Sequence, residues 1–187
     1  MARFASASAA RRPSASIALV AAQAVAGLAP AVSSRRWGLF AGLAIAVVLA
    51  DQASKALIAA SFSLGSRTPV VGDLVRIAPN ANSGALFGFF PDQAWLFGVL
   101  SLGVLALIVG YHARSGAAGP IMSVALGLLL GGAVGNLIDR LRFGYVLDFV
   151  DVGIGQLRWY TFNVADAAIS TSIVLLLVLA FMGERRP

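Results

Sequence analysis

The chain has 187 residues, of which 59% are hydrophobic and only 12% are charged. A soluble domain carries about 25% charged residues, so this composition and a mean hydropathy of +0.86 exclude an ordinary water-soluble fold and predict a membrane protein. The net charge of +6 does not indicate a nucleic-acid partner, because the arginines stand in short groups beside apolar runs, where they orient a protein in a membrane.

Reactive side chains other than carboxylates are scarce. The chain contains no cysteine, which excludes disulfides and a cysteine nucleophile, and a single histidine, His112. Zinc sites draw mostly on several His or Cys ligands, so neither a metal nor another cofactor is expected. His112 follows an apolar run and lies near Arg114, and we expect it to be a solvated loop residue.

Residues 1–36 are rich in Ala, Ser and Arg. The moderately apolar stretch Ile17 to Val32, after a basic start, is compatible with a signal peptide. Gln, Gly and Pro residues interrupt it, however, and we favour a disordered or interfacial cytoplasmic extension. Arg35 and Arg36 directly precede the next apolar run and tend to hold its beginning in the cytoplasm.

Four strongly apolar segments follow, each roughly 18–24 residues long and therefore able to cross about 30 Å of hydrocarbon as a helix. They are Trp37–Ala60, Ala94–Tyr111, Ala117–Ile138 and Phe162–Gly183. The fold class that they predict is an all-α membrane protein, a four-helix transmembrane bundle. The membrane domain then covers residues 37–183 and leaves residues 184–187 as a cytoplasmic tail.

The basic groups set the orientation of this bundle. They flank the first span, the link between the second and third spans, and the end of the fourth span: Arg35, Arg36, Arg114, Arg185 and Arg186. An even number of spans brings all of them to one side, predicted to be cytoplasmic together with both termini. The connections at residues 61–93 and 139–161 then face outward.

Two local patterns refine the bundle. Gly127, Gly131 and Gly135 recur every four residues in the third span and predict a face on which another helix approaches closely. In the first outer connection, Thr68 to Ile77 has β-branched residues around a Gly-Asp turn and predicts a small extracytoplasmic β-hairpin, which could cradle a substrate.

Of the eight acidic residues, four are singled out as candidates, at the outer ends of the spans or in the second outer connection. These are Asp51, Asp139, Asp148 and Asp166. The topology brings them to one level near the outer face, and acids at the edge of lipid are functional candidates. Asp51 could instead pair structurally with Lys55, four residues away, and Asp139 with Arg140.

Asp148 and Asp166 have no adjacent basic residue and stand in apolar surroundings. Two carboxylates held close cannot both ionise, so such a pair shares one proton. One member can then activate water while the other protonates a leaving amine. This is the hydrolytic chemistry that the sequence offers most readily, although it does not name a substrate.

At these residues the chain resembles the bacterial lipoprotein signal peptidases (signal peptidase II), over roughly Trp37 to Gly183. Five blocks carry the resemblance in the order of that family. They are Asp51–Lys55 (D-Q-x-x-K), Asn82–Gly88 (N-x-G-A-A-F), Gly135–Arg140 (G-N-x-x-D-R), Gly144–Phe149 (G-x-V-x-D-F) and Phe162–Asp166 (F-N-x-A-D). Leu86 stands where the family pattern has alanine and is the one departure in these blocks.

The resemblance implies an aspartic endopeptidase of the bacterial cytoplasmic (inner) membrane that needs no metal, with Asp148 and Asp166 as the catalytic pair. Its substrates would be diacylglyceryl-modified prolipoproteins, cut before the lipidated cysteine. Membrane lipid would be a partner, and no nucleic-acid partner is expected. We expect a monomer with its active site near the outer face. The supporting or substrate-binding residues implied are Asn82, Gly84, Asn136, Arg140, Asn163, Asp51, Lys55 and Asp139. For Asn163, capping of the last helix is an equally good interpretation.

Two other classes of function compete with this interpretation. A small transporter or proton relay also uses intramembrane carboxylates, but transporters bind near the midplane and often contain internal repeats, of which none is found here. A structural protein that dimerises through its glycine face would leave Asp148 and Asp166 without a role.

Overall fold

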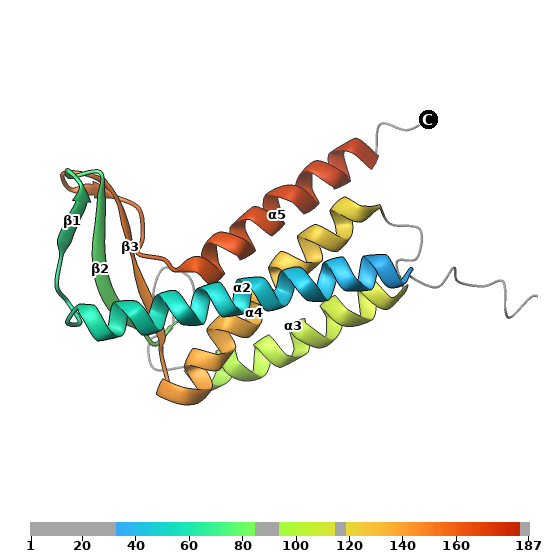
Figure 1. Cartoon of the computed structure of the whole chain (residues 1–187), viewed down its shortest axis with the longest axis horizontal. Helices are drawn as coiled ribbons and strands as arrows, with labels where there is room; N and C mark the ends of the chain where they lie inside the picture. The colour runs from blue at the N-terminus through green and yellow to red at the C-terminus, as the bar shows by residue number, and fades with distance from the viewer. Residues whose placement is uncertain (1–32, 85–93, 115–118, 184–187) are drawn as a thin grey trace, which may run out of the picture. The chain divides into compact units, whose positions relative to one another are not determined.

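The computed structural model describes residues 33–84, 94–114 and 119–183. Within these ranges the chain forms four helices and an antiparallel sheet that lies at one end of them (Figure 1). The helices are α2 (Ser34–Ser61), α3 (Ala94–Arg114), α4 (Pro120–Phe143) and α5 (Val164–Gly183). The strands are β1 (Thr68–Val71), β2 (Val75–Asn82), β3 (Val146–Ile154) and β4 (Leu157–Arg158). Residues 1–32 of the predicted extension and all of the predicted tail, residues 184–187, lie outside the described residues.

Helices α2, α3 and α4 continue past the ends of the apolar segments that predicted them. Helix α4 continues to Phe143 rather than ending at Ile138, so Asp139 and Arg140 are helical residues. Helix α3 likewise includes Arg114, which we had expected in a link. A charged residue after an apolar run need not end a helix. In α4, Arg140 and Arg142 lie in the last turn, where cations interact favourably with the free carbonyl groups.

Backbone chemistry sets the two ends of α4. Pro120 stands in its first turn, where the missing N–H costs nothing. Gly144 ends the helix at φ 75°, a conformation that suits glycine, and donates its N–H to the Arg140 carbonyl over 3.1 Å. This sharp end lets β3 start two residues later, at Val146.

Helices α2, α4 and α5 are each long and apolar enough to cross a membrane. Helix α3 adds a shorter apolar stretch, Gly98–Arg114. This part of the fold confirms a helical membrane protein.

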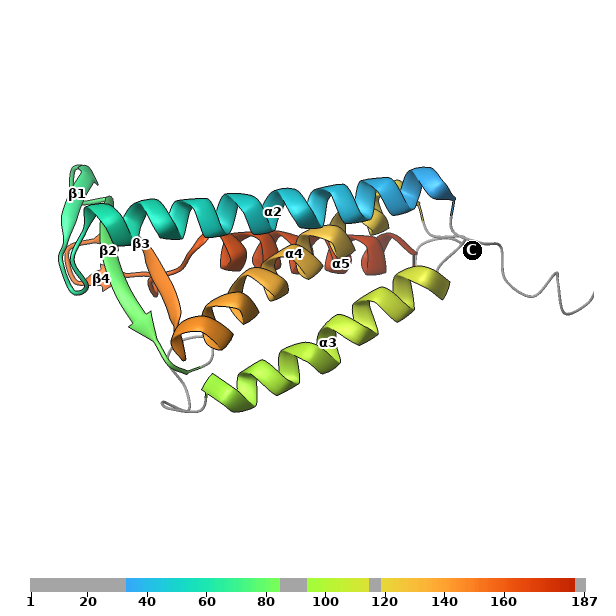
Figure 2. The same ribbon diagram turned by 60° about the horizontal axis from the view of Figure 1, so that its bottom comes forward.

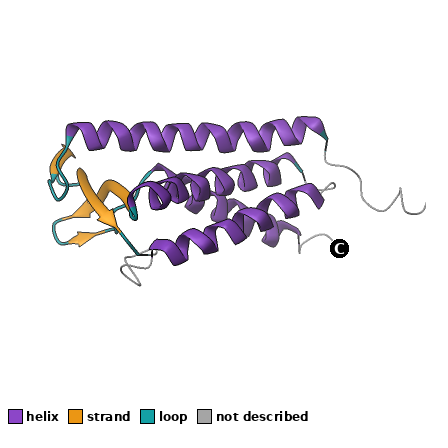
Figure 3. Cartoon of the chain, turned by 90° about the horizontal axis from the view of Figure 1, so that it is seen from below, coloured by secondary structure: helices purple, strands orange, loops and turns teal. Residues whose placement is uncertain are grey.

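Helix α4 packs against the other three helices. Figure 3 shows the helices lying alongside one another, with the strands gathered at one end. A Cβ atom added at Gly127 would lie 2.8 Å from the Phe40 carbonyl oxygen, and one at Gly131 would lie 2.7 Å from that of Ala44. On another side of α4, a Cβ atom at Gly132 would lie 2.5 Å from the Ala165 carbonyl oxygen. The expected close approach along the glycine face is therefore confirmed.

The predicted hairpin is confirmed as β1 and β2, which pair antiparallel around the turn at Gly72 and Asp73. The sheet is larger than a hairpin, however, because β3 pairs with β2 and β4 pairs with β3 (Figure 2). The fold is thus not all-α, and Asp148 lies on a strand rather than in a loop. Leu147 and Phe149 of β3 pack against Ile58 of α2, which joins the sheet to the end of the helices.

His112 is buried, not solvated: its side chain is only 1% exposed. Its ring stacks on Phe40 at 4.2 Å between centroids and meets the edge of Trp37 at 4.7 Å. The expectation failed because α3 continues past the apolar run and carries the imidazole against two aromatic rings of α2.

Candidate active site

Asp148 and Asp166 come from different elements and line the same cavity of about 680 Å³. Asp148 lies on β3 and is 1% exposed, and Asp166 lies in the first turn of α5. Asn82, Asn136 and Arg140 contribute polar groups to the same cavity. Its remaining lining is largely apolar, with residues of α3 such as Leu100 and Val104 and residues of α5 such as Ile169 and Ile173.

Asn163 connects the two carboxylates. Its side-chain Nδ2 donates to Asp148 Oδ1 over 2.7 Å, and its backbone N–H donates to Asp166 Oδ2 over 3.1 Å. Its Oδ1 accepts the Asp166 backbone N–H at 2.9 Å, which makes Asn163 the N-cap of α5 in a reciprocal capping arrangement. The capping interpretation of Asn163 is therefore confirmed, and the same side chain also contacts Asp148.

The second oxygen of each carboxylate also accepts from an asparagine. Asn82 Nδ2 donates to Asp148 Oδ2 over 2.9 Å, and Asn136 Nδ2 donates to Asp166 Oδ1 over 2.8 Å. Both carboxyl groups are thus held at both oxygens, and their rotation is restricted before any substrate binds.

The surroundings of Asp148 bring its pKa close to neutral pH. Burial, followed by the charge of Asp166, raises the pKa of Asp148 from 3.8 to about 7. The hydrogen bonds from Asn82 and Asn163 and the charge of Lys55 act in the opposite direction and lower this pKa. Near neutral pH, Asp148 can therefore be found with or without a proton.

Arg140 completes the polar rim of the cavity and is held there by backbone carbonyls of Gly84 and Asn136. Arg140 Nη2 donates to the Gly84 carbonyl over 3.3 Å, and its Nη1 donates to the Asn136 carbonyl over the same distance. The Gly84 N–H donates to Asn82 Oδ1 at 3.1 Å, which fixes the amide of Asn82 with its Nδ2 toward Asp148. The remainder of this sequence block, residues 85–88, lies outside the described residues.

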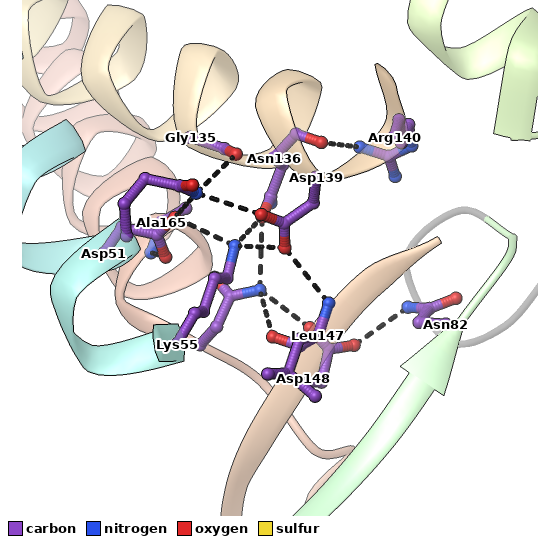
Figure 4. Close-up of polar contacts among 12 residues, drawn as sticks. Asp51, Lys55, Asn82, Gly135, Asn136, Asp139, Arg140, Leu147, Asp148 and Ala165 are labelled. Carbon is purple, nitrogen blue, oxygen red and sulfur yellow. Dashed lines mark hydrogen bonds and ion pairs between the residues drawn. The ribbon is translucent and has the colours of Figure 1, made fainter. Parts of the chain in front are cut away.

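A second buried polar layer, formed by Asp51, Lys55 and Asp139, lies beside Asn136 and Asp148 (Figure 4). Lys55 Nζ forms ion pairs with Asp51 at 2.8 Å and with Asp139 at 2.9 Å. The expected pair within α2 is confirmed, and Asp139 pairs with Lys55 of α2. Lys55 also donates to Asn136 Oδ1 at 3.0 Å, and this turns the Nδ2 of that amide toward Asp166.

The structure brings together all ten residues that the sequence analysis singled out. Sequence reasoning missed Gln52, which belongs to the same layer and donates to Asp139 Oδ1 over 2.9 Å. Its position inside the D-Q-x-x-K block was the available signal. The stretch Trp159–Phe162, which lines the cavity just before α5, was also missed. Among the described residues, no group of three or more His, Cys, Asp or Glu side chains is arranged to hold a metal ion.

The fold and this site define the chain as a helical membrane protein with a cavity, lined by carboxylates, where its helices meet a small sheet. The family model of signal peptidase (SPase) II matches residues 43–182. The chain belongs to the signal peptidase II family and is therefore a peptidase of the bacterial membrane.

Relatives and solved structures agree with this assignment. The lipoprotein signal peptidase of Syntrophomonas wolfei is 41% identical over 153 residues, which cover 81% of this chain and 96% of that protein. That of Geobacillus kaustophilus is 38% identical over 139 residues, or 74% and 90% of the two chains. A bacterial membrane enzyme solved by the in meso method at 2.3 Å superposes with a TM-score of 0.74 and 26% identity, over 84% of this chain and 94% of that one.

Proposed function

We propose that Asp148 and Asp166 are the catalytic pair with which this peptidase removes signal peptides from diacylglyceryl-modified prolipoproteins, cutting before the lipidated cysteine. Removal of signal peptides from prolipoproteins is the activity of the family to which the chain belongs. The observation that carries the assignment of the pair is the bridge through Asn163, which donates to both carboxylates at the wall of one cavity.

The pair performs hydrolysis with a single shared proton. The ionised carboxylate accepts a proton from a water molecule, and the oxygen of that water forms a bond to the scissile carbonyl carbon. The protonated carboxyl group then gives its proton to the leaving amine as the C–N bond breaks. The pKa of about 7 at Asp148, raised by burial and by the charge of Asp166, supports a pair that holds one proton near neutral pH.

The polar rim binds the substrate backbone. Asn82, Asn136 and Arg140 line the cavity beside the carboxylates, and carboxamides can both donate to and accept from a peptide unit. Asn163 orients the pair, and the Gly84 carbonyl accepts a hydrogen bond from Arg140. Asp51, Lys55 and Asp139 support the site from below.

The apolar walls receive the lipid portion of the substrate. Val104 of α3 and Ile173 of α5 lie along the cavity, away from its carboxylate end, and their surroundings suit acyl chains or the apolar part of a signal peptide. Membrane lipid is accordingly a partner of the protein. The closest contacts of the glycine face are made within the chain, which supports a monomer.

All four helices span the inner membrane in this proposal, with residues 1–36 as a cytoplasmic extension and both termini in the cytoplasm. The sheet and the cavity then lie near the outer face, where exported precursors arrive. Reporter fusions after Arg114 should report the cytoplasm and fusions after Phe143 the outer side. The reverse pattern would reject this orientation.

The catalytic pair is tested with a lipidated precursor peptide and the protein reconstituted in lipid. Asp148→Asn and Asp166→Asn should each insert normally and release no signal peptide, because an amide can neither take nor give the shared proton. The control is Thr171→Val on α5, whose exposed hydroxyl donates to the Ala167 carbonyl over 2.8 Å. Near wild-type turnover in either aspartate variant would reject the pair.

A further inference from the structure

Two buried aspartates each accept the backbone N–H of the residue that precedes a member of the pair. Asp51 Oδ1 accepts from the Ala165 N–H at 3.0 Å, directly before Asp166. Asp139 Oδ2 accepts from the Leu147 N–H at 3.1 Å, directly before Asp148. The same kind of contact therefore occurs on the strand and on the helix that carry the catalytic carboxylates (Figure 4).

The two accepting aspartates are themselves bridged twice. Lys55 Nζ lies 2.8 Å from one and 2.9 Å from the other, and its side chain is 5% exposed. Gln52 Nε2 donates over 2.9 Å to Asp139 Oδ1 and lies 3.2 Å from Asp51 Oδ2. Each aspartate thus uses its carboxylate both toward the bridge and toward a backbone N–H of the active site.

This assembly is anchored where α2 and α4 touch. Gln52 Nε2 also donates to the Gly135 carbonyl at 3.2 Å. Gly135 has no side chain, and a Cβ atom there would lie 2.7 Å from Asp51 Oδ2. The close helix contact therefore lets the Asp51 carboxylate of α2 reach the Ala165 N–H of α5, while Asp139 of α4 holds the Leu147 N–H of β3.

We propose that these four residues form a support cluster that sets the separation of the two catalytic carboxylates, and that Gln52 is a positioning residue of the reaction. The cluster consists of Asp51, Gln52, Lys55 and Asp139. This inference rests on the proposed catalytic pair. If Asp51 or Asp139 shifts, the backbone N–H that it holds shifts too, and the backbone carries this movement to the next residue, Asp166 or Asp148. The distance between the two catalytic carboxylates, across which the shared proton and the water molecule must fit, then changes.

Gln52 is the informative residue because it carries no charge and touches no group of the catalytic pair in the contacts described above. Gln52→Leu keeps the size of the side chain and removes its hydrogen bonds. We expect kcat on the lipidated precursor peptide to fall about 10- to 100-fold, with KM changed by less than about twofold, because the cavity walls are untouched.

The pH profile separates positioning from a loss of folded protein. The two apparent pKa values of a carboxylate pair lie further apart when the groups are held closer together. Gln52→Leu should therefore narrow the bell-shaped profile of kcat, with both limbs moving inward. The other titratable groups around the pair, Asp51, Lys55, Asp139, Arg140 and Tyr160, are the same in both proteins. Less folded enzyme alone would lower the profile without narrowing it.

A readout independent of activity is amide hydrogen exchange in peptides covering residues 144–150 and 162–168. Both should exchange faster in Gln52→Leu, because the Leu147 and Ala165 N–H groups lose firmly held acceptors. The matched control is Ser54→Ala on the same helix. The Ser54 hydroxyl donates to the backbone carbonyl of Asp51 at 2.8 Å, and its loss should leave activity and exchange unchanged.

Wild-type kcat, pH profile and exchange in Gln52→Leu would overturn the support cluster. In that case the proposed function would still hold as long as Asp148→Asn and Asp166→Asn are inactive. Activity in either of these two variants would reject the proposed function, whatever the result for Gln52→Leu. If Gln52→Leu does not accumulate as folded protein, Gln52→Asn is measured instead, with the same expected directions, since it keeps the amide but shortens its reach.

Discussion

The side-chain Nδ2 of Asn163 donates to the Asp148 carboxylate over 2.7 Å, while its side-chain Oδ1 caps α5, the helix that carries Asp166. A single side chain thereby couples the start of α5 to the strand β3. The start of α5 is therefore part of the site. A substitution of Asn163 can have two separate effects, the loss of the helix cap and the loss of a hydrogen-bond donor to Asp148.

Asn163→Ser distinguishes these effects, because serine caps helices as well as asparagine does but cannot reach Asp148. We expect its thermal stability to stay close to wild type and its kcat to fall about 100-fold as Asp148 loses a donor. Asn163→Ala should lose the same activity and in addition about 1 kcal/mol of stability. Thermal unfolding in detergent and cleavage of the lipidated peptide measure the two effects, and equal activity in wild type and Asn163→Ser would contradict the role at Asp148.

Asn82→Ala should move the basic limb of the activity profile to higher pH. The hydrogen bond from Asn82 stabilises the ionised form of Asp148 and lowers its pKa, so its removal raises the pKa above about 7. The shared proton is then retained to higher pH. The profile of kcat against pH measures the shift, and a basic limb that moves to lower pH would show that Asn82 stabilises the protonated form instead.

Asp148 should also make folding stability depend on pH. Its pKa rises from 3.8 in the unfolded chain to about 7 in the folded protein because of burial and the charge of Asp166, so the folded state binds the proton more tightly. This contribution is fully present below 3.8 and is lost as the pH rises through about 7.

Asp148→Asn removes that dependence. Its melting temperature relative to wild type should increase steadily between about pH 5 and about pH 8. A difference that is constant over this range would mean that Asp148 is ionised throughout and that its pKa is not raised.

Gly132→Ala should loosen the contact between α4 and α5. The added Cβ atom would lie 2.5 Å from the Ala165 carbonyl oxygen, in the residue that precedes Asp166. Overpacking of this kind costs about 1–3 kcal/mol, and we expect activity to fall along with stability because the start of α5 must shift. Gly103→Ala on α3 is the matched control, since its Cβ atom meets nothing within 4 Å and should leave both properties unchanged or slightly improved.

Much of this protein could be predicted from local sequence. Long apolar segments predict helices in lipid, because a helix forms all the hydrogen bonds of its backbone within the segment. The glycine spacing predicted the close approach of α4 to its neighbours, and the i,i+4 spacing predicted the ion pair between Asp51 and Lys55. The order of the motif blocks indicated the family, and the topology predicted that the acids gather at one end.

Other features depend on contacts between residues far apart in the chain. The strand pairing that extends the hairpin into a sheet and places Asp148 on β3 is one of them, since pairing is decided by partners and not by the segment alone. The burial of His112 among aromatic rings of α2 is another.

By itself, the sequence determined which segments are apolar enough to form membrane helices and where the carboxylates and asparagines of the candidate site lie along the chain. Tertiary structure alone decided how these groups are held: that Lys55 bridges Asp51 to Asp139, that Gln52 joins them, and that their carboxylates hold the N–H groups before Asp148 and Asp166. The physical reason is that a hydrogen bond depends on distances of a few tenths of an ångström. Such distances arise only when α2, α4, α5 and β3 have packed together.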